Sequence, residues 1–270
     1  MFKNKNIIIT GASAGLGKAM AYSFAELGAN ICLAARRVEL LHTLKKDIQE
    51  RYPDIQILIF KTDVKNQLSC ERLLKEAVKQ MGSLDIFIAN AGQSMWSRFR
   101  DIADPKEMQE LMQLNYMGVV FNAFYALPYL RQSHGSFVVI SSIQGVLPVP
   151  FHSGYVASKY AVNGFIDTLR LEEPDIHFLL ALPSWIAGTE LRAHALTGAA
   201  EESVIVNKHH SKKIMSAESC AQNIIRALKD RHDQVYIPKK YQYVSLLRQF
   251  FTKFIDRRIL ARVKKQLRAE

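Results

Sequence analysis

The sequence predicts an α/β fold, a doubly wound parallel sheet with helices on both faces, built as a single domain. Short apolar runs alternate with longer amphipathic stretches along the chain, which is typical of parallel strands joined by right-handed helical crossovers. Runs such as Ile7–Thr10 and Phe137–Ser141 are apolar almost throughout, as expected of strands covered on both faces. With 270 residues, 49% of them hydrophobic, the chain can bury one substantial core or at most two small ones.

The expected strands are short and rich in β-branched residues. They are Asn6–Thr10, Asn30–Ala34, Ile55–Lys61, Leu84–Ala89, Ser136–Ser141 and His177–Leu182. Apolar residues recur at helical spacing between them, which predicts crossover helices over Leu16–Leu27, Glu39–Arg51 and Ser69–Met81. The apolar stretch Tyr116–Leu130 is interrupted by Gly118, Asn122 and Pro128. It predicts a buried helix, because a bilayer span needs about 20 apolar residues.

The cysteines, the histidines and the first residues narrow the classes of function. Cys32, Cys70 and Cys220 show neither pairing nor ligand spacing, which favours a reducing, cytoplasmic compartment. The eight histidines are scattered, so we expect no metal site. The opening "MFKNKN" leads directly into the first expected strand, so we expect no signal peptide.

The positive charge is concentrated at the C-terminal end. The whole chain carries a formal charge of +11, and from Lys239 onward ten Lys and Arg stand against Asp256 and Glu270, a net +8. No break in composition precedes about residue 235. We therefore expect one folded domain over residues 1–238 and a basic extension over 239–270.

A glycine-rich turn, "TGASAGLG", lies between the first expected strand and the first helix. Gly11 permits the tight turn, Gly15 lets backbone amides approach a pyrophosphate, and Gly17 allows close helix–strand contact. The N-terminus of the helix offers unpaired N–H groups to phosphates. The other interpretation is a simple turn of small residues. The expected dinucleotide contacts here are Gly11, Ser13, Ala14, Gly15, Leu16 and Gly17.

Two arginines end the second expected strand, in "CLAARR". At this position many nicotinamide enzymes carry an acidic residue for the adenosine ribose. Arg36 and Arg37 would not repel a 2′-phosphate and can bind one through paired hydrogen bonds. A solvated basic start to the next helix is the alternative. Together with the glycine turn, the arginines favour NADP over NAD.

Further motifs give the chain a resemblance to the short-chain dehydrogenase/reductase family over roughly Lys5 to Glu190, and this resemblance implies a Rossmann fold. The stretch "ALPYLRQSHGSFVVISS" looks most like the branch that contains hydroxysteroid dehydrogenases. The resemblance implies cofactor contacts from the "DV" and "NAG" motifs and chemistry from a later set. In this sequence the contacts are Asp63, Val64, Asn90, Ala91 and Gly92, and the later set is Asn115, Ser142, Tyr155 and Lys159.

Tyr155 and Lys159 stand one helical turn apart, so they share a helix face. A second Tyr-x-x-x-Lys, Tyr236 to Lys240, contains Pro238 and has Asn223 thirteen residues upstream, where the first pair has Ser142. We therefore expect Tyr155 to be the proton donor, with its pKa lowered by Lys159, and Ser142 to hold the substrate oxygen. The resemblance implies that Lys159 also binds the nicotinamide ribose and that Asn115 keeps a water-linked proton path to it.

The chain departs from the family pattern after the sixth expected strand. Pro183 is followed by Ser184 in place of glycine, and Thr189 comes one residue late. We expect cofactor contacts from Ile186 and Thr189, and an apolar carbonyl or alcohol as substrate. Expected pocket walls, for which a core or lid position is the alternative, are Ser94, Met95, Trp96, Val149, Phe151 and Trp185.

The C-terminal stretch Ser245–Arg268 predicts one basic amphipathic helix. Leu247, Phe250, Phe251, Phe254, Ile255, Ile259, Val263 and Leu267 recur at helical intervals, and Lys and Arg fill the remaining positions. Such a composition favours an anionic membrane surface. A helix that caps the pocket or joins subunits is the alternative. The sequence contains no recognised nucleic-acid-binding module.

These observations predict an NADP(H)-dependent oxidoreductase that interconverts a carbonyl and an alcohol on a hydrophobic, lipid-like or steroid-like substrate. The alternative is a non-catalytic NADP-binding regulator or scaffold at a membrane surface. The resemblance implies a homodimer or homotetramer built through the helices that carry Asn115 and Tyr155.

Overall fold

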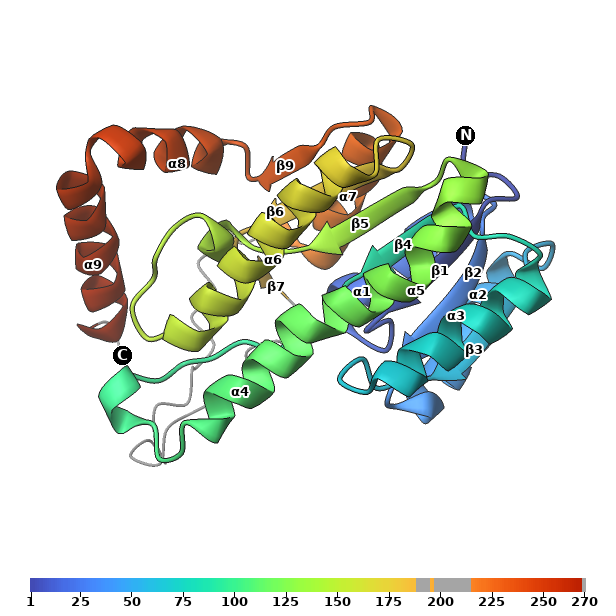
Figure 1. The fold of residues 1–270 in the computed structure, drawn as a ribbon, viewed down its shortest axis with the longest axis horizontal. Helices are drawn as coiled ribbons and strands as arrows, with labels where there is room; N and C mark the ends of the chain where they lie inside the picture. Colours follow the sequence, from blue (N-terminus) through green and yellow to red (C-terminus); the bar gives the residue numbers. More distant parts are fainter. Residues whose placement is uncertain (188–194, 197–214, 269–270) are drawn as a thin grey trace.

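A seven-stranded sheet forms the centre of the computed structural model, which describes residues 1–187, 195–196 and 215–268. The strand order is β3-β2-β1-β4-β5-β6-β9, and neighbouring strands pair in parallel (Figure 1). The order reverses between β1 and β4, where open α/β sheets bind ligands beyond the carboxyl ends of the strands. The strands are β1 (Asn6–Thr10), β2 (Asn30–Ala35), β3 (Ile57–Lys61), β4 (Ile86–Ala89), β5 (Ser136–Ile140), β6 (His177–Pro183) and β9 (Gln234–Ile237).

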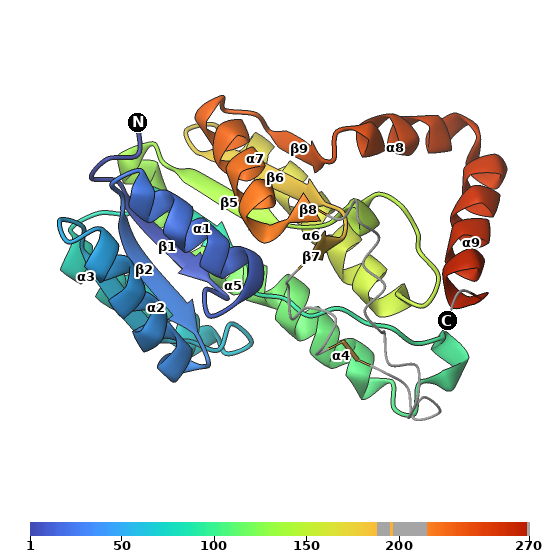
Figure 2. The same ribbon diagram turned by 180° about the vertical axis from the view of Figure 1, so that it is seen from behind.

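Helices cover both faces of the sheet, as predicted. On one face lie α3 (Gln67–Met81), α5 (Gly118–Ser133) and α6 (Ser153–Glu172) (Figure 1). On the other lie α1 (Gly15–Glu26), α2 (Val38–Arg51) and α7 (Ala217–Lys229) (Figure 2). Alternate strand residues enter opposite cores: Ile7 and Ile9 pack toward α1 and α2, whereas Ile8 packs toward α3 and α5. This alternation is the period of two expected of a strand.

The six predicted strands are all present, with small differences at their ends. β3 and β4 each begin two residues later than predicted, at Ile57 and Ile86. Just before each strand, a backbone group bonds a side chain instead of a neighbouring strand. Asn30 Oδ1 accepts from the Gln56 amide at 2.9 Å, and the Ser133 hydroxyl donates to the Leu84 carbonyl at 2.6 Å. The edge strand β9 and the helix α7 were not predicted.

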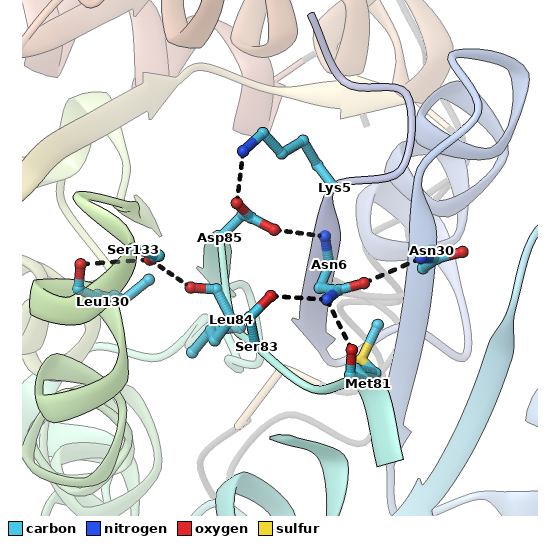
Figure 3. Close-up of polar contacts among 9 residues, drawn as sticks. All are labelled: Lys5, Asn6, Asn30, Met81, Ser83, Leu84, Asp85, Leu130 and Ser133. Atoms are coloured by element: carbon cyan, nitrogen blue, oxygen red, sulfur yellow. Dashed lines mark hydrogen bonds and ion pairs between the residues drawn. The ribbon is translucent and has the colours of Figure 1, made fainter. Parts of the chain in front are cut away.

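Polar side chains tie the amino ends of the central strands together (Figure 3). The Asn6 side chain donates to Ser83 Oγ at 2.8 Å and accepts from Asn30 Nδ2 at 2.9 Å. The Asp85 carboxylate accepts from the Asn6 amide at 2.9 Å and from the Lys5 ammonium at 2.6 Å. We call Lys5, Asn6, Asn30, Ser83 and Asp85 the amino-edge network. It joins β1, β2 and the approach to β4 away from the ligand-binding edge.

The buried helix predicted over Tyr116–Leu130 is confirmed as the central part of a longer element. Helix α4 (Lys106–Met112) passes through a π-helical segment, Gln113–Met117, into α5, which includes Pro128. Within the described residues, no helix has the length and apolar character needed to cross a membrane. Shorter elements are the 3-10 turns Phe99–Asp101 and Ile143–Gly145 and the paired strands β7 (Ile186–Ala187) and β8 (Met215–Ser216).

The prediction of one continuous helix over Ser245–Arg268 is wrong. The structure has two helices, α8 (Lys240–Phe250) and α9 (Thr252–Arg268), with a break at Phe251 where ψ is 45°. The Arg248 guanidinium donates to the Asp256 carboxylate at 2.8 Å. In a straight helix, the Cα atoms of residues eight apart are separated by roughly 12 Å along the axis. The turn brings the two side chains close enough to pair.

Candidate active site

A cavity of about 670 Å³ opens at the carboxyl edge of the sheet. It collects side chains and backbone from the ends of β1, β2, β3, β4, β5 and β6, together with the start of α6. Of the predicted site residues, it is lined by Gly11, Ser13, Ala14, Gly15, Leu16, Arg36, Arg37, Asp63, Val64, Asn90, Ala91, Gly92, Ser142, Tyr155, Lys159 and Ile186. Thr189 lies outside the described residues.

The glycine turn has the backbone that its sequence predicts. Gly11 and Gly15 have φ of 65° and 54°, in the region that favours glycine. A Cβ on Gly11 would stand 2.9 Å from Ala91 Cα, and one on Gly17 would overlap the Gly11 carbonyl oxygen. Gly17 therefore faces the turn and is not part of the cavity wall. Its role is to let α1 begin against the end of β1.

Asn90 braces this turn from the neighbouring strand. Its Nδ2 donates to the carbonyls of Thr10 at 3.0 Å and Gly11 at 3.2 Å. In return the Thr10 hydroxyl accepts from the Asn90 amide at 3.1 Å. The contacts hold the ends of β1 and β4 together at the switch point. Asn90 was predicted as a cofactor contact, and the structure adds this positioning role.

The start of α1 suits an anion. Its N-cap, Ala14, makes no side-chain hydrogen bond to the first turn, so no cap competes for the amides that a helix N-terminus directs outward. Nearby, Arg36 and Arg37 are exposed at the cavity wall, and Arg37 Nη2 donates to Ser13 Oγ at 3.1 Å. The glycine turn and the end of β2 thus bring two guanidiniums and a hydroxyl to one part of the cavity.

Ser142, Tyr155 and Lys159 line the same cavity. Ser142 follows β5, and its hydroxyl donates to the Pro183 carbonyl at 3.4 Å and lies beside the Tyr155 phenol, whose pKa it lowers. Ser142 Oγ also accepts from the Gln144 amide at 3.1 Å, which fixes it on its 3-10 turn. Lys159 Nζ lies 5.7 Å from the Tyr155 ring centroid and donates to the Ile140 carbonyl at 2.9 Å. The three predicted side chains thus line one cavity, and their roles in chemistry stay a prediction.

The predicted lowering of the Tyr155 pKa by Lys159 is wrong for this structure. Burial raises the pKa of Tyr155 to about 12, against a smaller lowering from the neighbouring Ser142 hydroxyl. Burial also lowers the pKa of Lys159 to about 8. The physical reason is that loss of water penalises the charged form of each group. The phenol is therefore protonated at neutral pH and has a proton to donate.

Asn115 is fully buried in the π-helical segment and does not line the cavity. Its Oδ1 accepts from the Gln93 amide at 2.9 Å, and its Nδ2 donates to the Gln93 carbonyl at 2.9 Å and to Ser158 Oγ at 3.0 Å. A Cβ on Gly92 would stand 3.2 Å from Asn115 Oδ1 and 3.8 Å from Lys159 Nζ. Asn115 thus fixes the loop after β4 to α6, next to Lys159.

Two of the six predicted pocket walls, Ser94 and Trp185, line the cavity. The described side chains of Met95, Trp96, Val149 and Phe151 do not. Met95 packs with Leu111 and Tyr155 in a small apolar cluster, and Trp96 stacks on Phe151 with ring centroids 5.4 Å apart. For Met95, Trp96 and Phe151 the structure thus favours packing with neighbouring side chains, the alternative position that the sequence left open.

Three side chains that the sequence analysis missed belong to the site. His152 is buried, with its ring centroid 5.7 Å from Trp185 and 6.4 Å from Tyr155. It is the N-cap residue of α6, three residues before Tyr155, and this closeness in sequence was the signal that could have identified it. Gln144 lines the cavity, and its buried Oε1 has no hydrogen-bond partner among the described residues. Thr62, beside the "DV" motif, also lines it.

The second Tyr-x-x-x-Lys is structural, as predicted. Tyr236 lies in β9 and packs against the core beneath α5 and α6, while Lys240 begins α8. The two residues belong to different elements and do not form a helical pair.

Comparisons with known proteins identify relatives of the chain. A family model described as short chain dehydrogenase matches residues 5–198. An 11-beta-hydroxysteroid dehydrogenase of Pinus massoniana is 32% identical over 262 residues, which cover 94% of this chain and 72% of that protein.

Solved structures share the fold. An alcohol dehydrogenase of Thermococcus sibiricus, complexed with 5-hydroxy-NADP, has a TM-score of 0.77 at 24% identity and covers 87% of this chain and 96% of its own. A short chain dehydrogenase/reductase of Burkholderia phymatum, in complex with NAD, has a TM-score of 0.81 at 20% identity and covers 94% and 95%. At these identities the likeness establishes the fold alone.

Proposed function

The chain belongs to the short-chain dehydrogenase/reductase family, near its hydroxysteroid dehydrogenase-like branch, and from this premise we propose that it uses NADP(H) to interconvert a carbonyl and an alcohol on a hydrophobic, lipid-like or steroid-like substrate. Membership makes it a carbonyl/alcohol oxidoreductase. One observation carries the finer proposal: a single cavity joins the glycine turn, both arginines and the Ser142–Tyr155–Lys159 set.

The residues present fit a phosphorylated dinucleotide. The glycine turn leaves no room for a Cβ at Gly11, and the start of α1 carries no side-chain cap, so backbone amides are available to a pyrophosphate. Arg36, Arg37 and Ser13 would hold the 2′-phosphate that distinguishes NADP from NAD. The bound nicotinamide would supply the hydride.

The proposed chemistry on the substrate follows from three side chains. The Ser142 and Tyr155 hydroxyls, which line the same cavity, would both donate to the substrate carbonyl oxygen and polarise it. Tyr155 would then transfer its proton to that oxygen, since burial keeps the phenol protonated at neutral pH. Lys159, held by the Ile140 carbonyl, would return a proton toward Tyr155, with Asn115 keeping the water-linked path beside it. In the oxidative direction the same groups act in reverse.

The substrate end of the cavity combines apolar walls with one unmatched polar atom. Trp185, Ile143 and Ile186 contribute apolar surface, which suits a hydrophobic carbonyl or alcohol. Gln144 Oε1, which is buried and has no partner in the part of the chain that the structure describes, would accept a hydrogen bond from a substrate donor, because a buried acceptor left unmatched costs free energy.

The proposal also covers the compartment in which the chain acts and its oligomeric state. The chain would act in the cytoplasm, because Cys32, Cys70 and Cys220 are all buried free thiols. It would form a homodimer or homotetramer through α5 and α6, which leave Phe124 and Tyr160 exposed at 70% and 42%.

Turnover separates this proposal from the non-catalytic alternative. Purified protein is incubated with NADPH and a panel of apolar ketones and aldehydes, including steroid ketones, and NADPH absorbance is followed. We expect oxidation of NADPH with at least one class of carbonyl. Tight NADPH binding without turnover on the whole panel would favour a binding protein.

A further inference from the structure

The turn between α8 and α9 gathers exposed apolar side chains at one corner of the molecule. Phe250, Phe251 and Phe254 are 75%, 59% and 56% exposed. We define the corner patch as Tyr243, Leu246, Leu247, Phe250, Phe251 and Phe254, all of them exposed. We propose that the corner patch and the basic residues around it bind the surface of an anionic lipid bilayer.

The break at Phe251 is what forms the patch. In α8, Tyr243, Leu247 and Phe250 recur at spacings of four and three, which places them on one helix face. Because the chain turns at Phe251, the first turn of α9 adds Phe254 at the same corner. The Arg248–Asp256 ion pair and a bond from the Thr252 hydroxyl to the Arg248 carbonyl at 2.8 Å hold the turn. Contiguous exposed apolar side chains such as these mark interaction sites.

Basic residues surround the corner patch. Lys253, Arg257 and Arg258 are exposed on α9, and the Arg258 guanidinium lies 5.2 Å from the centroid of the Phe254 ring. The one carboxylate of the two described helices, Asp256, is paired with Arg248. Aromatic rings that insert at the headgroup level, flanked by cations that reach lipid phosphates, are the composition of an interfacial helix.

Charge favours a lipid surface over a second copy of the chain. From Lys239 to the C-terminus the net charge is +8. In a two-fold contact the same patch lies on both subunits, so two such surfaces would face each other with like charge. An anionic bilayer offers the opposite sign, and each Lys or Arg near it adds to binding.

The two helices lie on the side of the molecule where the cavity opens. β5, β6 and β9 point their carboxyl ends toward α8 and α9, and both helices stand beyond that edge of the sheet (Figures 1 and 2). A chain bound through the corner patch would therefore have its catalytic edge on the membrane side. Delivery of an apolar substrate from the bilayer rests on the proposed function, whereas binding to the bilayer does not.

Sedimentation with vesicles tests the proposal on the full chain, without cofactor or substrate. We expect the chain to pellet with phosphatidylcholine vesicles that contain phosphatidylserine, and not with phosphatidylcholine alone. We expect the triple variant Phe250→Ala, Phe251→Ala, Phe254→Ala to lose roughly tenfold or more in partitioning. Lys253→Glu, Arg257→Glu, Arg258→Glu would lose on the order of a hundredfold. Raised salt would release the bound wild type.

Matched controls place equal changes on other exposed surfaces. Leu40→Ala, Leu68→Ala, Leu171→Ala removes apolar side chains that are 41%, 66% and 83% exposed. Arg72→Glu, Lys75→Glu, Lys79→Glu reverses three exposed charges on α3. Both controls should pellet like the wild type. The proposal is overturned if the wild type does not pellet, if all variants pellet equally, or if light scattering shows that the three Phe→Ala changes dissociate an oligomer without altering vesicle binding.

Discussion

The amino and carboxyl ends of the strands, which form two opposite edges of the sheet, use similar polar residues in different ways. At the amino edge, Asn6 is bonded to Ser83, Asn30 and Asp85 (Figure 3), and these bonds tie β1 to β2 and to the approach to β4. At the carboxyl edge, Asn90 bonds the carbonyls of β1 and the glycine turn, and the groups around it line a cavity. Backbone groups just beyond the ends of the strands need hydrogen-bond partners outside the ladder. Here side chains close one edge, while the other stays open to a ligand.

Burial acts differently at the two edges. Lys5 at the amino edge keeps its ammonium half exposed beside Asp85, with 48% of its side chain accessible. Lys159 at the carboxyl edge is buried and faces a neutral carbonyl, so its pKa is lowered to about 8. An exposed ion pair contributes little, whereas a buried, unpaired ammonium costs stability. The carboxyl edge is therefore less stable than it could be, because it holds the buried ammonium of Lys159 next to Tyr155.

The largest expected effect is at the open edge. Tyr155→Phe removes the proton donor, so turnover should fall on the order of a thousandfold, while NADPH affinity and the free energy of unfolding change little. Turnover is measured by NADPH absorbance and binding by NADPH fluorescence. Asn6→Ala serves as the control, because it should leave turnover per folded molecule unchanged. Activity in the phenylalanine variant equal to the wild type would remove Tyr155 from the mechanism.

Lys159 should make the free energy of unfolding depend on pH. Its folded pKa of about 8 lies below its ordinary 10.5, so between these values the unfolded chain binds more protons and the free energy of unfolding rises with pH. Above pH 10 Tyr155 opposes this, because its folded pKa is raised to about 12 from 10.0. Lys159→Met should be about 3 kcal/mol more stable than the wild type at neutral pH, with the difference shrinking above pH 8. Urea unfolding of both proteins from pH 7 to pH 10 checks this, and parallel curves would contradict it.

The arginines should separate the two coenzymes. Arg36→Ala, Arg37→Ala should weaken NADPH binding roughly thirtyfold, since charged hydrogen bonds contribute about 2 kcal/mol, and leave NADH binding unchanged. Fluorescence titration with each coenzyme provides the measurement. Equal losses for NADPH and NADH would mean that the arginines do not read the 2′-phosphate.

The two asparagines offer a matched pair. Asn6→Ala should lower the free energy of unfolding by about 1.5 kcal/mol, because its buried partners lose their hydrogen bonds, and should not change NADPH affinity. Asn90→Ala should lower both the free energy of unfolding and the NADPH affinity, since it removes the hydrogen bonds to the glycine turn. Denaturant unfolding and NADPH titration of the two variants test the contrast. It fails if Asn6→Ala weakens NADPH binding as much as Asn90→Ala.

The smallest expected effect is at the closed edge. Lys5→Ala removes a half-exposed ion pair with Asp85, so the free energy of unfolding should fall by less than about 1 kcal/mol. Added salt should reduce the difference between the variant and the wild type. A loss of several kcal/mol would show that the amino-edge network depends on this ion pair.

Local spacing made much of this molecule predictable. The glycine turn and the Tyr155–Lys159 pair depend on neighbours within one turn or helix, and the alternation of strands and helices depends on sequence period. Contacts between distant segments left no such signal: Lys159 is held by the backbone of Ile140, and the Arg248–Asp256 pair requires a break at Phe251. The pKa of Tyr155 was predicted in the wrong direction because burial, which the sequence does not display, raises it by more than the neighbouring Ser142 lowers it.

The account rests on one cavity that holds both the coenzyme and the proton donor. The most direct measurement is a crystal structure of the chain soaked with NADPH. We expect the adenosine phosphate beside Arg36 and Arg37 and the nicotinamide end beside Ser142, Tyr155 and Lys159. A coenzyme bound with its nicotinamide directed away from Tyr155, or bound outside this cavity, would contradict the account.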